Sequence, residues 1–128
     1  MRKPVEFDNY PIDIPFGPYR AVLKHWVDGD TCDAYIDQGL NKYAYETLRI
    51  RNLNTWEIYG QKDPGELEKG QAARQAALDL VPIGTPVKVV TYKDKTSFGR
   101  YIADIILEDG RDVATEMTRL GHAKPEAT

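Results

Sequence analysis

Alternating apolar and polar residues predict three successive β-strands in the first half of the chain. Residues 19–27 (YRAVLKHWV) consist largely of strand-forming residues and end at an Asp-Gly dipeptide, which is typical of tight hairpins. Residues 31–37 alternate strictly between small apolar and polar side chains, which places one apolar row on one face of a strand. A third strand, residues 43–51, follows a turn that contains glycine and asparagine. Together these segments predict an antiparallel meander.

The pattern changes to a helical period after residue 62. Asp63, Pro64 and Glu66 predict an N-cap, a proline in the first turn and the carboxylate of a capping box. Apolar residues then recur at helical spacing from Ala73 to Leu80, so a helix of about four turns is expected. Three elements follow, namely two strands and a short helix: residues 85–92, 100–110 and 113–120.

This order, three strands, a helix, two strands and a helix, predicts a mainly β protein with some α structure. It is the chain order of a five-stranded OB-fold barrel, a fold that commonly binds oligonucleotides. The barrel domain is expected to span residues 19–124. A proline-rich stretch, residues 1–18, is expected to form an extended arm before it, and residues 125–128 form a short tail.

Composition narrows the class of protein without identifying it. The chain has 128 residues, of which 41% are hydrophobic and 29% charged, as expected for one globular domain. The formal net charge of −3 excludes a general polycation that coats nucleic acid, although a local basic site remains compatible with it. The single cysteine, Cys32, excludes an internal disulfide. No apolar run approaches membrane length, so we expect a cytoplasmic protein or the mature form of a secreted one.

Three short segments carry candidate chemistry. In VDGDT, residues 27–31, Asp30 offers a carboxylate to a hard cation, although aspartate is also common in turns. In LRIRNLNTWE, residues 48–57, an arginine and a glutamate flank two oxygen donors, which also fits a solvated strand end. In SFGR, residues 97–100, the arginine is by itself an ordinary surface charge. Each segment alone has a plain structural explanation.

In this order and on this strand pattern, the three segments resemble the staphylococcal nuclease family. The residues that carry the resemblance are VDGDT, then LR followed after four residues by NTWE, then FGR, and finally GHAK at 121–124. The family usually has D-[TA]-P-E where this chain has NTWE. The resemblance covers residues 19–124 and does not include the proline-rich stretch before them.

The resemblance implies a nuclease that hydrolyses DNA or RNA, preferably single-stranded, with little sequence specificity. Its cofactor would be Ca²⁺ or another divalent cation. Each site residue is expected from its position in these motifs. The metal ligands would be Asp30, Asn54 and the carbonyl group of Thr55; the general base would be Glu57; and the phosphate-binding arginines would be Arg49 and Arg100.

Two residues depart from the family pattern. Asn54 stands where the second metal-binding aspartate is usual, which keeps an oxygen ligand but removes a full negative charge. Trp56 replaces a proline, and its indole could pack on the barrel or stack on a base. Tyr92 and Lys93 are further candidates for the nucleic-acid surface. These departures leave open an alternative, an OB-fold module that binds single-stranded nucleic acid but is impaired in cutting it.

Overall fold

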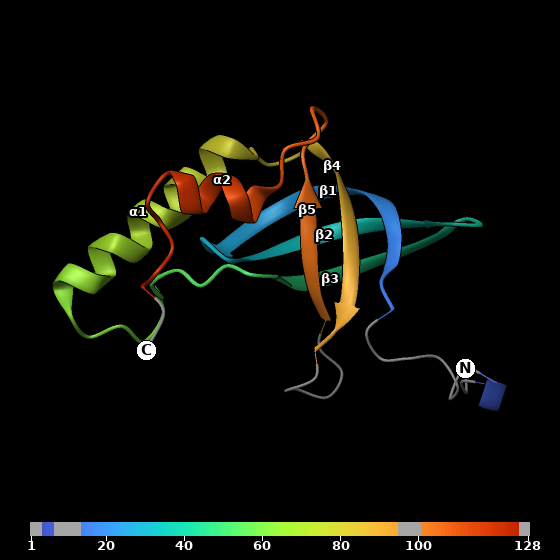
Figure 1. The fold of residues 1–128 in the computed structure, drawn as a ribbon, viewed down its shortest axis with the longest axis horizontal. Helices are drawn as coiled ribbons and strands as arrows, with labels where there is room; N and C mark the ends of the chain where they lie inside the picture. The colour runs from blue at the N-terminus through green and yellow to red at the C-terminus, as the bar shows by residue number, and fades with distance from the viewer. Residues whose placement is uncertain (1–3, 7–13, 95–100, 126–128) are drawn as a thin grey trace.

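The computed structural model describes residues 4–6, 14–94 and 101–125. Within them lie five strands and two helices (Figure 1). Their bounds are β1 (Phe16–Asp28), β2 (Thr31–Gly39), β3 (Lys42–Ile50), α1 (Pro64–Leu80), β4 (Pro86–Lys93), β5 (Tyr101–Ile106) and α2 (Val113–Arg119). The order βββαββα confirms the order expected from the sequence.

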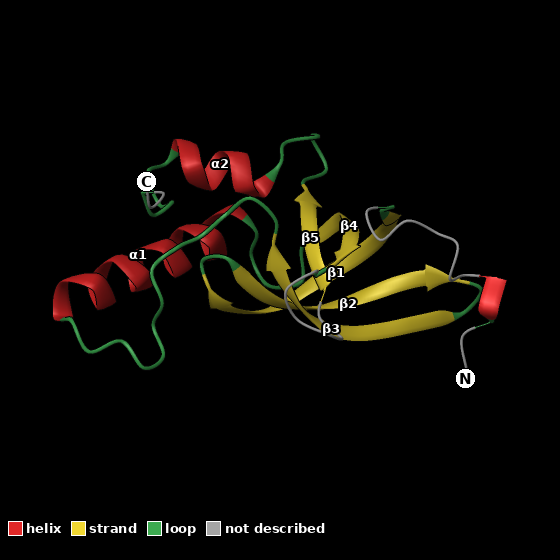
Figure 2. Cartoon of the chain, turned by 60° about the horizontal axis from the view of Figure 1, so that its bottom comes forward, coloured by secondary structure: helices red, strands yellow, loops and turns green. Residues whose placement is uncertain are grey.

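The five strands close into a mixed barrel in the order β1-β2-β3-β5-β4. All neighbouring strands are antiparallel except β3 and β5, which are parallel. This topology confirms the predicted closed barrel and is consistent with an OB-fold. Both helices lie at one end of the barrel (Figure 2), where α1 contacts β1 and α2 contacts β5.

The barrel closes through only a short stretch of pairing between β3 and β5. Within the described residues the two strands pair only at Arg49 with Ile102 and at Ile50 with Ala103. The preceding part of β3 pairs with β2 on one side only. The other edge of this part of β3 therefore faces an opening in the barrel wall.

The barrel interior follows the predicted alternation. Cys32, Ala34 and Ile36 are buried in one row of β2, as expected from the sequence. Burial raises the pKa of the Cys32 thiol to about 12, so this cysteine remains a protonated core residue and not a nucleophile. Trp26 of β1 is fully buried, and its indole Nε1 donates a hydrogen bond to the carbonyl oxygen of Val81, 3.0 Å away, just after α1.

The start of α1 matches the predicted cap in part. The Asp63 carboxylate accepts hydrogen bonds from the backbone N–H groups of Gly65 and Glu66, at 2.8 and 3.1 Å. The backbone N–H of Asp63, however, donates to the side chain of Gln61, at 3.2 Å, and not to Glu66. The reciprocal half of the predicted capping box is therefore wrong, because a glutamine just upstream supplies the acceptor.

Strand β1 begins earlier than expected. Phe16 pairs with Thr91 of β4, so residues 16–18, which were predicted to belong to the arm, are part of the barrel. Among the residues that the structure describes, no helix is long and apolar enough to span a membrane.

The buried Trp26 provides a test of this core. Trp26→Phe should lower the free energy of unfolding by about 2–3 kcal/mol, because it leaves a void and removes the hydrogen bond to the Val81 carbonyl group. Urea denaturation followed by far-UV circular dichroism measures the change. Tyr59→Phe, at a position 71% exposed, is the control and should alter stability by less than about 0.5 kcal/mol. Equal changes in the free energy of unfolding for the two substitutions would contradict the placement of Trp26 in the core.

Candidate active site

A single buried carboxylate, that of Asp30, connects three segments at the helical end of the barrel. Asp30 lies in the turn between β1 and β2 and is only 5% exposed. Its Oδ1 accepts a hydrogen bond from the Thr31 hydroxyl group at 2.8 Å, and its Oδ2 accepts one from the backbone N–H of Thr55 at 3.0 Å. Its backbone carbonyl oxygen also accepts the N–H of Ile50, at 2.8 Å. The β1–β2 turn, the end of β3 and the following loop are thereby held together.

Arg49, near the end of β3, completes this arrangement. Its Nη2 lies 3.2 Å from Asp30 Oδ2, 3.2 Å from the carbonyl oxygen of Leu53 and 3.1 Å from Asn54 Oδ1. We refer to these three oxygens as the Arg49 oxygen cluster. The Arg49 Nε–H is buried and has no hydrogen-bond partner within the described residues. A buried donor without an acceptor is costly, and an oxygen supplied by a ligand would remove that cost.

Backbone hydrogen bonds hold the loop after β3 at two adjacent residues, Asn54 and Thr55. The Asn54 carbonyl oxygen accepts the backbone N–H of Lys124 at 2.7 Å, so the segment after α2 packs against the site. Thr55 is 1% exposed, and its hydroxyl oxygen has no hydrogen-bond partner in the described part of the chain. Backbone hydrogen bonds thus place both Asn54 and Thr55, and the Asn54 side chain adds a contact to Arg49.

Small residues of α1 allow both parts of the site to lie close to the helix. A Cβ atom at Gly70 would stand 2.7 Å from the Glu57 carbonyl oxygen and 3.0 Å from that of Trp56. A Cβ atom at Gly29, in the β1–β2 turn, would stand 2.8 Å from the Cβ of Ala73. The glycine in the middle of α1 weakens the helix intrinsically, but it permits the loop carrying Glu57 to rest on the helix.

Asp28 belongs to the same cluster of charges, although the sequence suggested only a turn residue. Its Oδ1 accepts the N–H of Ile58 at 3.2 Å. Burial raises the pKa of Asp28, and the nearby charges of Asp30 and Glu57 raise it further, against the opposing effects of the Ile58 hydrogen bond and of Arg49. The two aspartates of the DGD sequence, spaced two residues apart, were the available signal for this pairing.

The structure therefore brings together most of the expected site residues. Asp30, Arg49, Asn54 and Thr55 are linked directly by the contacts above, and Glu57 lies two residues further along the same loop, close enough to affect Asp28. The second expected arginine, Arg100, lies outside the described residues.

The three candidates for a nucleic-acid surface lie in different settings. The Trp56 ring is half-buried, with the Lys69 ammonium group 4.9 Å from its centre. Tyr92 donates a hydrogen bond to Asp104 at 3.2 Å and lies 4.2 Å from the guanidinium group of Arg51. Lys93 is exposed at the end of β4. Tyr92 is thus engaged in an ion-pair cluster on the barrel, and Trp56 already contacts a cation.

The oxygens of the site fit a hard cation in type, since a carboxylate, an amide and backbone carbonyl groups are ligands of Ca²⁺. The buried hydroxyl of Thr55, which has no hydrogen-bond partner within the described residues, adds one more oxygen. Two of these oxygens, however, already surround the positive charge on Arg49. The described residues also contain no group of three histidine, cysteine or acidic side chains placed to hold a metal. Asp30 and Asn54 could therefore hold a cation only in competition with Arg49.

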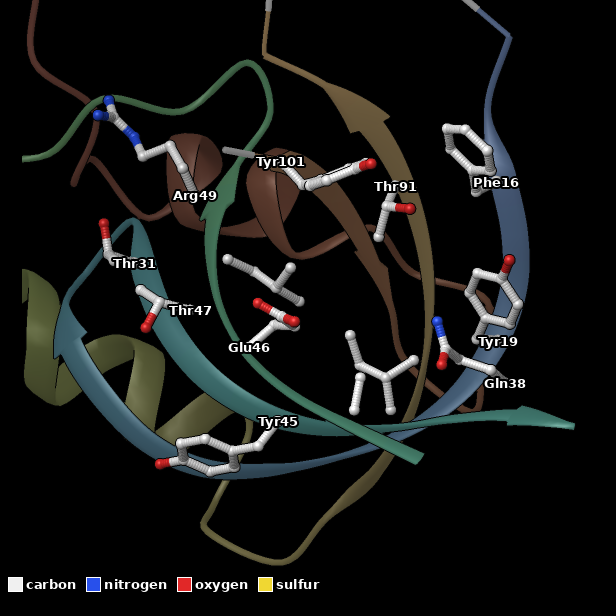
Figure 3. A pocket seen from close by; sticks show the side chains of 13 residues that line it. Phe16, Tyr19, Thr31, Gln38, Tyr45, Glu46, Thr47, Arg49, Thr91 and Tyr101 are labelled. Atoms are coloured by element: carbon white, nitrogen blue, oxygen red, sulfur yellow. The ribbon is translucent and has the colours of Figure 1, made fainter. Parts of the chain in front are cut away.

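A cavity of about 720 Å³ opens beside Arg49, between the free edge of β3 and strands β1, β4 and β5 (Figure 3). Sequence reasoning did not anticipate it. Aromatic residues line it from several strands, and Glu46 points into it. The available signal was Glu46 itself, because it is a charged residue in the row of β3 that also contains Leu48, which is buried.

The fold and the site together define a five-stranded mixed barrel with a buried carboxylate–guanidinium centre at one rim. No protein-family model matches this chain, and no curated protein matches it in sequence. The nuclease resemblance thus depends on the motifs and on their positions in the fold.

The raised pKa of Asp28 predicts how stability responds to pH. Because the folded state disfavours the charged carboxylate, Asp28 contributes stability below its unfolded pKa of 3.8, and this contribution is lost as pH rises through the folded value. Asp28→Asn keeps an oxygen for the Ile58 N–H and should raise the free energy of unfolding at pH 7. The gain should shrink as pH falls towards 3.8.

Urea denaturation at a series of pH values measures this difference. Asp109→Asn is a suitable control, because hydrogen bonds from Arg111, first from its backbone and then from its side chain, lower the pKa of Asp109. That substitution should therefore give no gain at pH 7. A destabilised Asp28→Asn protein at neutral pH would contradict the prediction.

Proposed function

We propose that this chain is a metal-assisted phosphodiesterase of the staphylococcal nuclease type, acting on single-stranded DNA or RNA. The observation that carries the proposal is the direct linkage of Asp30, Arg49, Asn54 and Thr55, which come from three separate segments, at the edge of a cavity. These are the residues that the family motifs assign to cation and phosphate binding.

Arg49 would bind the phosphate. The oxygen cluster fixes its Nη2, so the planar guanidinium group is held in one orientation before a ligand arrives. Its Nε–H is buried and has no acceptor within the described residues, so a phosphate oxygen that reached it would supply one. A donor fixed in advance stabilises the growing negative charge of the transition state without having to reorganise.

Glu57 would accept the proton of the attacking water. It follows Thr55 and Trp56 on a loop whose backbone rests against Gly70, so its position is set by the scaffold. Asp30, Asn54 and the Thr55 carbonyl group would hold the cation, and when bound a hard cation supplies charge that polarises a phosphate oxygen. Burial raises the pKa of the nearby Asp28, and the charges of Asp30 and Glu57 raise it further.

Removing the proposed base tests the mechanism. Glu57→Gln should lower the rate of cleavage of denatured DNA in the presence of Ca²⁺ by about 10²-fold or more, because the amide cannot accept a proton. EDTA should abolish the wild-type activity. The control Glu68→Gln makes the same change of charge at an exposed position of α1 and should leave the rate unchanged. Cleavage that persists in Glu57→Gln and in EDTA would overturn the mechanism.

A second function, binding of single-stranded nucleic acid without efficient cleavage, is favoured by one observation. Arg49 Nη2 occupies the space among the oxygens that a cation would need, and Asn54 supplies no charge to displace it. In this case Arg49 would still contact phosphate, and the barrel would act as a binding module.

Asn54→Asp distinguishes the two functions. A second carboxylate should raise both the affinity for Ca²⁺, measured by calorimetry, and the cleavage rate, because hard cations are held largely by ligand charge. Wild-type protein that binds oligonucleotides but shows no turnover, with turnover appearing in Asn54→Asp, would establish the binding module. Measurable turnover in the wild type would establish the enzyme.

A further inference from the structure

The cavity beside Arg49 has a defined chemical character. Tyr101 of β5 and Phe16 and Tyr19 of β1 form one side of it (Figure 3). The rings of Phe16 and Tyr101 contact edge to face, with centroids 6.2 Å apart. Flat apolar rings around an open space are the groups on which a nucleobase stacks.

Glu46 is an exposed residue of β3 at the open side of this cavity. It lies in the row of β3 that also contains Ala44 and Leu48, and Leu48 is 1% exposed in the core. Figure 3 shows the Glu46 side chain pointing into the cavity. It has no hydrogen-bond or ion-pair partner within the described residues. A carboxylate can only accept hydrogen bonds, so it provides an acceptor directed into an aromatic-lined space.

Arg49 borders the same cavity. Arg49 stands three positions after Glu46 on β3, a rise of about 10 Å, which is comparable with the length of a nucleotide from its phosphate to the outer edge of its base. The two side chains leave opposite faces of the strand, and both line the cavity, where this edge of β3 has no partner strand. A nucleotide whose phosphate contacts Arg49 could therefore place its base among the rings, with the edge of the base near Glu46.

We propose that this cavity is a nucleobase site and that Glu46 selects bases bearing an exocyclic amino group, favouring cytosine over uracil or thymine. The inference rests on the proposed function, since it assigns the base subsite of the same substrate. Acidic side chains accept a hydrogen bond from the N4 amino group of cytosine. Uracil and thymine present a carbonyl oxygen at that position, and an oxygen facing the Glu46 carboxylate is repelled and leaves both acceptors unpaired.

A carboxylate among aromatic rings also suits a quaternary ammonium group. The guanidinium group of Arg49 at the edge of the same cavity opposes a cationic ligand and favours one that carries a phosphate. The nucleotide is therefore the better match to the charges around the cavity.

The experiment measures binding of cytidine 5′-monophosphate and uridine 5′-monophosphate by calorimetry in EDTA, so that no cation is bound. Wild-type protein should bind the cytidine nucleotide about tenfold more tightly. Glu46→Gln can both donate and accept, and it should reduce the preference to about twofold or less without abolishing binding. Glu68→Gln, which makes the same charge change on α1, should keep the wild-type preference. Circular dichroism confirms that each variant is folded.

Equal affinity of the wild type for the two nucleotides, or a preference unchanged in Glu46→Gln, would overturn the inference. Glu46-dependent binding of tetramethylammonium without nucleotide binding would overturn it in favour of a cation site. A cleavage assay separates this inference from the proposed function. Cleavage without any preference for cytosine would support the phosphodiesterase and refute the base site. Selective binding without cleavage would support the base site and refute the phosphodiesterase.

Discussion

The site depends on one buried carboxylate. Asp30 is almost inaccessible to solvent, and a buried charge is tolerated only when its oxygens are paired. Both of its oxygens accept hydrogen bonds, and one of them also faces the guanidinium group of Arg49. Removing this carboxylate would leave the Thr55 N–H without its acceptor and take away the only charged oxygen of the Arg49 oxygen cluster, so the position of the loop at Thr55 depends on it. The Arg49 side chain is 38% exposed, and solvent screens its attraction to Asp30 accordingly.

Helix α1 serves as the surface on which this arrangement rests. Gly29 packs against Ala73, and the backbone of the loop at residues 56–57 packs against Gly70. A larger side chain at either contact would push a site segment away from the helix by displacing backbone. Gly70 lowers the stability of the helix, but it allows the loop at residues 56–57 to pack closely against α1.

Local patterns predicted most of the fold. Alternation in residues 31–37 and the helical period around Ala73 depend on neighbouring residues, so the strands and α1 were visible in the sequence. Asp30 and Arg49 were identified from short motifs, and their direct contact agrees with that grouping. The cavity could not be predicted in this way, because it results from the short pairing between β3 and β5, which is a long-range property. Phe16 was placed in an arm for the same reason, since its strand is defined by a partner on β4 far along the chain.

Asn54 and Arg49 are best understood together. The Arg49 oxygen cluster contains one carboxylate, one amide and one backbone carbonyl group around a single guanidinium nitrogen. The formal charge of this group is zero, so it is balanced without a bound cation. With an aspartate at position 54, two carboxylates would face the single positive charge of Arg49, which leaves one negative charge uncompensated. The site would then attract a divalent cation more strongly. With asparagine, Arg49 itself provides the positive charge, and in the proposed function an incoming phosphate would compete with Asp30 for it. The balance between the two proposed functions, enzyme and binding module, would therefore depend on how firmly this one guanidinium group is held by its three oxygens.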